Sequence, residues 1–139
     1  DLQSFKCAHS YDHHKDKVQQ VEWHFIEPTI MLTASFDKTA VVFNSRSPKN
    51  VASWNLGNTD PECVRWDPFS PQYFYVSTES GLVLCFNARN SNKIAPDMKP
   101  TIVASRDLGV EKVFSAQFCL DLPFHLAVAG SEGNVRIWD

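Results

Sequence analysis

The sequence has 139 residues, of which 43% are hydrophobic and 12% aromatic, with 13 Lys and Arg against 16 Asp and Glu for a formal charge of -3. This composition suffices for one packed domain and is too apolar for a disordered chain. No apolar run is long enough to span a membrane, and no secretory signal opens the sequence. Because it lacks an initiator Met and ends directly after a strand-like run, we expect a piece of a longer protein. The mild acidity gives no general attraction for nucleic acid, so any RNA contact must be local.

An internal repeat organises the sequence. Three segments align without gaps on an aromatic residue that is followed by a proline, by a second aromatic residue and directly after it by Asn or Asp. In order of repeat, the anchors are Trp23, Trp66 and Phe118, the prolines Pro28, Pro71 and Pro123, the second aromatics Phe43, Phe86 and Trp138, and the last markers Asn44, Asn87 and Asp139. Since these markers keep the same offsets in every copy, they indicate repeated structural units.

Each repeat predicts short strands of alternating or continuous apolar residues, with tight turns between them. In chain order, the predicted strands are 18–23, 30–35, 40–44 and 51–54, then 63–66, 73–78 and 82–87, and finally 113–118, 125–130 and 134–139. No window has the 3.6-residue period of a helix. The sequence therefore predicts an all-β fold.

Four short strands in a repeat of 43 residues, with Trp-Asp closing the third repeat, are typical of a WD-repeat β-propeller. An immunoglobulin-like sandwich is also all-β, but it has no reason to repeat its sequence at a fixed period. We therefore predict about three blades of a larger, seven-bladed propeller. Residues 1–12 would end a preceding blade, 13–55 and 60–96 would form two blades, and 97–139 would form an outer strand and a partial last blade.

The third repeat begins nine residues later than the spacing of the first two repeats requires. The intervening stretch contains two pieces that resemble an outer strand, 92–95 and 101–105, where one is expected. An enlarged loop is one explanation. The other, which we predict, is that the chain skips a whole blade between about residues 95 and 100.

Many WD blades share a hydrogen-bonded set: a His before the first strand, a Ser or Thr in the second, an Asp in the turn and a Trp in the third. His14, Thr33 and Asp37 match the first three positions. The fourth is Phe43, whose side chain has no N–H, so the set cannot close. The other repeats depart further from the pattern, and we expect apolar packing to hold these blades together.

The densest group of possible metal ligands is His9, Asp12, His13, His14 and Asp16. Ligands crowded into one loop lack a rigid supporting shell, so we predict no metal site here. No nucleophile elbow, phosphate-binding loop or dinucleotide fingerprint occurs. We therefore predict no enzyme activity, no cofactor and no small-molecule substrate.

The four cysteines, Cys7, Cys63, Cys85 and Cys119, are at least 22 residues apart, which excludes a Cys-x-x-Cys zinc or redox site. Apolar neighbours predict that the last three are reduced and largely buried. A reducing, intracellular compartment fits this usage.

Two arginines recur at the repeat period, Arg46 in Asn-Ser-Arg and Arg89 in Asn-Ala-Arg. An arginine two residues after the third strand would lie on the same rim of each blade, where it could bind a carboxylate or phosphate of a partner. A local hydrogen bond that stabilises the turn is the alternative. Both readings stay open from the sequence.

A more specific resemblance lies in three stretches: DKVQQVEWHFIEP with SFDKTAVVFNSRSP, ECVRWDPFSPQYFYVSTESGLVLCFNARN, and CLDLPFHLAVAGSEGNVRIWD. Over most of residues 13–95 and 100–139 they resemble the periodic tryptophan protein one family of eukaryotic WD-repeat proteins. The resemblance implies a further blade between the segments ending at Asn87 and Asp139. It also implies a non-catalytic scaffold of the nucleolus or nucleus that binds precursors of the large ribosomal subunit, both RNA and assembly factors, and supports ribosomal RNA processing.

Two other functions remain open. The Asn-x-Arg turns resemble the WD-x-Arg box by which substrate receptors dock to cullin-type ubiquitin ligases, although Phe-Asn replaces Trp-Asp in both copies. A histone- or chromatin-binding propeller is the other. Co-purifying partners would separate the three.

Overall fold

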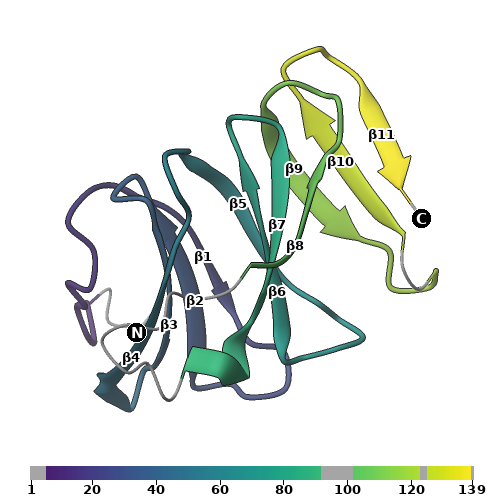
Figure 1. Ribbon diagram of the computed structural model, residues 1–139. Coiled ribbons are helices and arrows are strands. Elements are labelled where there is room, and N and C mark those ends of the chain that lie inside the picture. The colour runs from purple at the N-terminus through teal and green to yellow at the C-terminus, as the bar shows by residue number, and fades with distance from the viewer. Residues whose placement is uncertain (1–5, 92–101, 123–124, 139) are drawn as a thin grey trace.

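The computed structural model describes residues 6–91, 102–122 and 125–138. Within them, three antiparallel sheets follow one another along the chain and lie side by side (Figure 1). Sheet 1 contains β1 (Val18–Trp23), β2 (Ile30–Ser35), β3 (Thr39–Asn44) and β4 (Ser47–Asn55). Sheet 2 contains β5 (Pro61–Trp66), β6 (Tyr73–Thr78), β7 (Leu82–Asn87) and β8 (Ile102–Asp107), and sheet 3 contains β9 (Val113–Phe118), β10 (Leu126–Gly130) and β11 (Val135–Trp138). Each sheet pairs its strands in sequence order, as blades of a propeller do.

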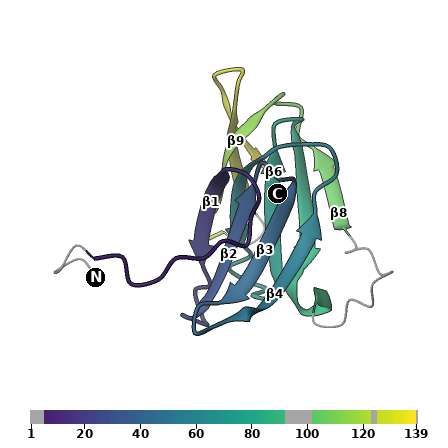
Figure 2. The same cartoon turned by 90° about the vertical axis from the view of Figure 1, so that its left-hand side faces the viewer.

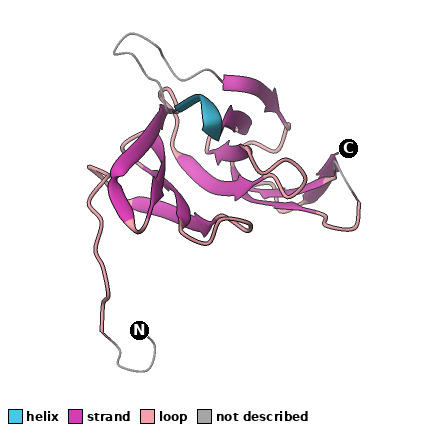
Figure 3. Cartoon of the chain, turned by 90° about the horizontal axis from the view of Figure 1, so that it is seen from below, coloured by secondary structure: helices cyan, strands magenta, loops and turns pink. Residues whose placement is uncertain are grey.

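The described part of the chain contains a single helix, the short 3-10 helix η1 (Ala88–Ser91), which follows β7 (Figure 3). No helix among the described residues is long and apolar enough to cross a membrane. The fold class predicted from the repeats is therefore confirmed.

The main core lies between sheets 1 and 2. Side chains alternate between the two faces along each strand, so every second side chain points toward the neighbouring sheet. These positions hold apolar residues. Trp54 from β4 and Phe74 from β6 meet edge to face with ring centroids 5.0 Å apart, and Phe74 stacks on Phe86 at 5.3 Å. All three side chains are buried. A second core cluster joins sheets 2 and 3 around Val83, Val113 and Val128.

The innermost strands β1, β5 and β9 are also joined by polar contacts. The backbone N–H of Val64 donates to Gln20 Oε1 at 3.2 Å, and that of Trp66 donates to Glu22 Oε2 at 2.8 Å. On the other side of β5, Arg65 Nε donates to the carbonyl oxygen of Ala116 at 3.1 Å. Burial raises the pKa of Glu22, although the Trp66 N–H and Arg65 oppose this. Side chains of β1 and β5 thus form hydrogen bonds with the backbone of the next inner strand.

The outer strand of sheet 2 differs from the prediction. It is β8, which pairs with β7 from Leu82↔Asp107 to Phe86↔Ile102, so it lies beyond the predicted blade boundary at residue 96. Sheets 2 and 3 also pack directly against each other, with β9 beside β5 and β6. Within the predicted piece 101–105, residues 102–105 therefore belong to sheet 2 and not to a further blade. The alternative outer strand at 92–95 and the predicted break at 95–100 lie outside the described residues, as do residues 1–5; residues 6–12 contain no strand.

Candidate functional site

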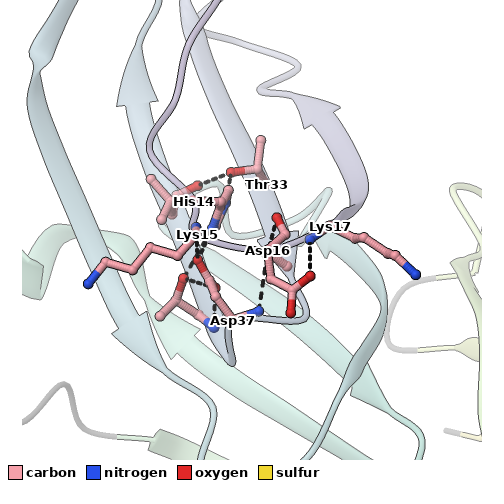
Figure 4. Close-up of polar contacts among 9 residues, drawn as sticks. His14, Lys15, Asp16, Lys17, Thr33 and Asp37 are labelled. Atoms are coloured by element: carbon pink, nitrogen blue, oxygen red, sulfur yellow. Dashed lines mark hydrogen bonds and ion pairs between the residues drawn. The ribbon is translucent and has the colours of Figure 1, made fainter.

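The first candidate residues meet beside sheet 1. The segment before β1 crosses the face of sheet 1 that points away from sheet 2 (Figure 2) and brings His14 between β2 and the β2–β3 turn. His14 Nε2 lies 2.8 Å from Thr33 Oγ1, and His14 Nδ1 lies 3.0 Å from Asp37 Oδ2 (Figure 4). Asp37 also accepts hydrogen bonds from the Lys15 backbone N–H at 2.9 Å and from the Thr39 hydroxyl at 2.6 Å. The structure therefore brings His14, Thr33 and Asp37 into one network.

The network sets the ionisation of Asp37. Burial alone would raise the pKa of this carboxyl group, but the hydrogen bonds from Thr39, Lys15 and His14 outweigh burial and lower it. Asp37 is thus a carboxylate at neutral pH and holds the preceding segment by charge-assisted hydrogen bonds. Its role is structural, because all its described partners belong to the same blade.

Phe43 occupies the fourth position and is covered by aromatic side chains from the preceding segment. The ring centroid of His13 lies 4.6 Å from that of Phe43, and Tyr11 lies at 4.9 Å. The Tyr11 hydroxyl donates to the carbonyl oxygen of Ser45 at 2.9 Å. The sequence analysis missed this cluster. The alternation of Tyr11 and His13 in an extended segment was the available signal, because it places both on one side.

The remaining repeat markers occupy different environments. Trp66 and Phe86 are buried in the main core, whereas Trp23 is 52% exposed. Phe118 packs against Tyr75 with ring centroids 5.0 Å apart, and Trp138 is partly buried against the second core cluster. Burial of each marker among the described residues therefore follows from whether a described sheet faces it.

Arg46 and Arg89 occupy equivalent turns. The backbone N–H of Arg46 donates to Asn44 Oδ1, and that of Arg89 donates to Asn87 Oδ1, both at 2.9 Å. The turn is thus stabilised by the asparagine side chain and by the arginine backbone. Both arginines are exposed, and their guanidinium groups form no hydrogen bond or ion pair with the described residues. Within the described part of the chain, no side chain therefore neutralises either arginine.

One of the two arginines lines a groove of about 1050 Å³ between sheets 1 and 2, which we call the inter-sheet groove. Arg89 of η1 and Lys49 of β4 lie along it, and η1 contacts β4. Ile26 and Glu27 of the β1–β2 loop line it as well. Arg46 does not line it. Of the two arginines, only Arg89 therefore lines a groove between two described sheets.

Two groove residues were missed by the sequence analysis. Lys49 lies in a bulge of β4, because Ser47 pairs with Asn44 and Val51 with Phe43, which leaves 48–50 outside the ladder. His24 is buried with a clear bonding pattern: its Nδ1 accepts from the backbone N–H of Glu27 at 2.9 Å, so its Nε2–H donates to the carbonyl oxygen of Pro71 at 3.0 Å. His24 thereby ties the β1–β2 loop to the β5–β6 loop. Neither residue has a motif that sequence reading could detect.

Metal ligation and disulfide chemistry have little support in the described part of the chain. No group of three or more His, Cys, Asp or Glu side chains is placed to hold a metal ion there. The four cysteines are free: Cys63 and Cys85 are buried, Cys119 is only partly buried, and Cys7 is exposed. Burial raises the pKa values of the Cys63 and Cys85 thiols, which makes them unreactive at neutral pH.

Comparison with known proteins agrees with this geometry. Residues 5–44 match the family model of the WD domain, G-beta repeat. Residues 5–44 therefore resemble a WD40 repeat. A WD repeat-containing protein of Schizosaccharomyces pombe, itself uncharacterised, is 32% identical over 120 residues. The match covers 58% of this chain and 23% of the relative, so the chain spans about a quarter of that protein's length.

Proposed function

We propose that this WD40-repeat chain belongs to a non-catalytic scaffold that binds protein partners through the rims of its sheets. The observation that carries the proposal is the inter-sheet groove with its exposed Arg89 and Lys49, neither of which is paired with a described residue. WD40 propellers are usually non-catalytic and mediate protein–protein interactions, and the match to residues 5–44 supports the same role here.

The more specific part of the proposal is a role in assembly of the large ribosomal subunit, in the nucleolus or nucleus. It is supported by the resemblance of the three repeat segments to the periodic tryptophan protein one family. In this role the protein binds assembly factors and precursor ribosomal RNA within a pre-60S particle and supports ribosomal RNA processing. The net charge of -3 favours protein contacts over a broad RNA-binding face.

Affinity purification of the tagged full-length protein tests this role. We expect the protein to sediment with large-subunit precursors on a sucrose gradient and to co-purify with precursor ribosomal RNA and assembly factors. RNase treatment of the extract separates contacts with protein from contacts made through RNA. Recovery of cullin-ligase adaptor subunits or of histones, without pre-ribosomal particles, would contradict the ribosomal role.

A further inference from the structure

We infer that the inter-sheet groove binds an extended peptide segment of a partner protein, in which an acidic side chain stands next to an apolar one. The inference deepens the proposed scaffold function, because it names the surface and the chemistry of its occupant. It rests on the arrangement of charge, apolar surface and fixed backbone along the groove.

The basic end of the groove is formed by Arg89 and Lys49. Arg89 follows the Asn87 turn into η1, and the β4 bulge carries Lys49 out of its ladder, while η1 and β4 are in contact. Both side chains are exposed, and neither forms an ion pair with a described residue. Two cations with no ion pair among the described residues give this part of the groove a positive charge, in a chain whose net charge is -3. A guanidinium binds a carboxylate with two parallel hydrogen bonds.

Apart from these two cations, the groove is lined by both polar and apolar side chains, and part of its apolar surface is exposed. Ile26 is 61% exposed and Val51 is 42% exposed, and both line the groove. Large exposed apolar side chains beside a hollow are typical of a binding surface. Glu27 lies with Ile26 on the β1–β2 loop, so it repels an acid from that end. The acidic side chain of the partner therefore belongs at Arg89 and Lys49, and the apolar one beside Ile26.

The backbone around the groove is held in place before any partner binds. The His24 ring joins the β1–β2 loop to the carbonyl of Pro71 and meets the Trp66 ring edge to face, with centroids 4.5 Å apart. A groove with fixed walls loses little conformational entropy on binding, which favours recognition of a short peptide. RNA is the less suitable occupant, because two cations neutralise few phosphates.

Fluorescence anisotropy with the purified full-length protein tests the inference. The probe is a short fluorescein-labelled peptide that alternates Asp or Glu with Leu or Phe. Its matched controls are the peptide with every acid changed to its amide, and a labelled single-stranded oligouridine. We expect the acidic peptide to bind about tenfold or more tightly than the amide peptide.

Charge reversal locates the site. Arg89→Glu and Lys49→Glu should each weaken acidic-peptide binding by about tenfold or more, whereas Lys17→Glu should change it by less than about twofold. Lys17 is exposed, lies before β1 and does not line the groove. Its replacement by Glu changes the net charge by the same amount as the two groove variants, but away from the groove. Equal weakening by all three variants would overturn the inference, as would binding of oligouridine but not of the peptide. Failure to sediment with pre-ribosomal particles, with peptide binding intact, would refute only the ribosomal role.

Discussion

Replacing Asp37 by Ala tests the network that joins the segment before β1 to sheet 1. The side chain of Asp37 is 11% exposed and accepts hydrogen bonds from His14, from the Lys15 backbone and from Thr39. The Thr39 bonds are local to the turn, and water can replace them. The His14 and Lys15 bonds link separate segments, and each hydrogen bond to a charged group contributes about 1.5–3 kcal/mol. We therefore expect Asp37→Ala to lower the free energy of unfolding by about 3 kcal/mol.

Ser80→Ala is the matched control, because Ser80 holds the same turn position in the second repeat. Its hydroxyl lies 2.9 Å from Thr78 Oγ1 and 3.1 Å from Thr59 Oγ1, both neutral partners, so its loss should cost about 1 kcal/mol. Urea unfolding, followed by the fluorescence of the buried Trp54 and Trp66, measures both values. A cost for Asp37→Ala no larger than that for Ser80→Ala would refute the reasoning.

Two further measurements on the same variant isolate the cause. A double-mutant cycle with His14→Ala should give a coupling free energy of about 1 kcal/mol or more, whereas additive costs would mean that the two residues act independently. The lowered pKa of Asp37 also sets a pH dependence. Its stabilisation is present above the unfolded pKa of about 3.9 and is lost as pH falls through the lower folded pKa. Asp37→Ala should therefore flatten the acid limb of the stability profile.

Four other variants test the packing of the sheets. Because burial raises the pKa of Glu22, the ionised carboxylate destabilises the fold at neutral pH. The Glu22→Gln variant should therefore be at least as stable as the original protein at pH 7. In urea titrations across pH, the variant should also lack the rise in stability that the original protein shows as pH falls through the folded pKa of Glu22. Trp54→Ala should lower the free energy of unfolding by about 3–5 kcal/mol in the same assay, because Trp54 is 1% exposed. Trp23→Ala, at a position that is 52% exposed, should lower it by less than about 1.5 kcal/mol. Similar losses for the two variants would contradict the assigned core. Gly81→Ala should lower the melting temperature, because Gly81 has φ of +83° and a Cβ there would collide with the backbone oxygen of Glu111; an unchanged melting temperature would show that sheets 2 and 3 are not packed as described.

Several structural features were readable from the sequence because they depend on local periodicity. Period-2 alternation and turn residues predicted β1, β2, β6, β7 and β9 with the bounds that the structure has. The association of His14 with Thr33 and Asp37 was also predicted, since a repeated motif carries its hydrogen-bonding partners at fixed offsets. The outer strands were predicted less well. An outer strand buries little surface, as the exposed residues of β8 illustrate, so its sequence carries no strong pattern.

The sequence by itself determined an all-β chain of repeated four-strand units, the Asn-x-Arg turns and the aromatic anchors, because each depends on residues close together in one repeat. Only the tertiary structure decided which residues of different repeats pack against each other or line the same groove. Packing of sheet 1 on sheet 2 buries Trp66. It also forms a groove that both Arg89 and Lys49 line. The physical reason is that a repeat repeats its local chemistry, whereas the surface facing each residue is supplied by a neighbouring sheet with a different sequence.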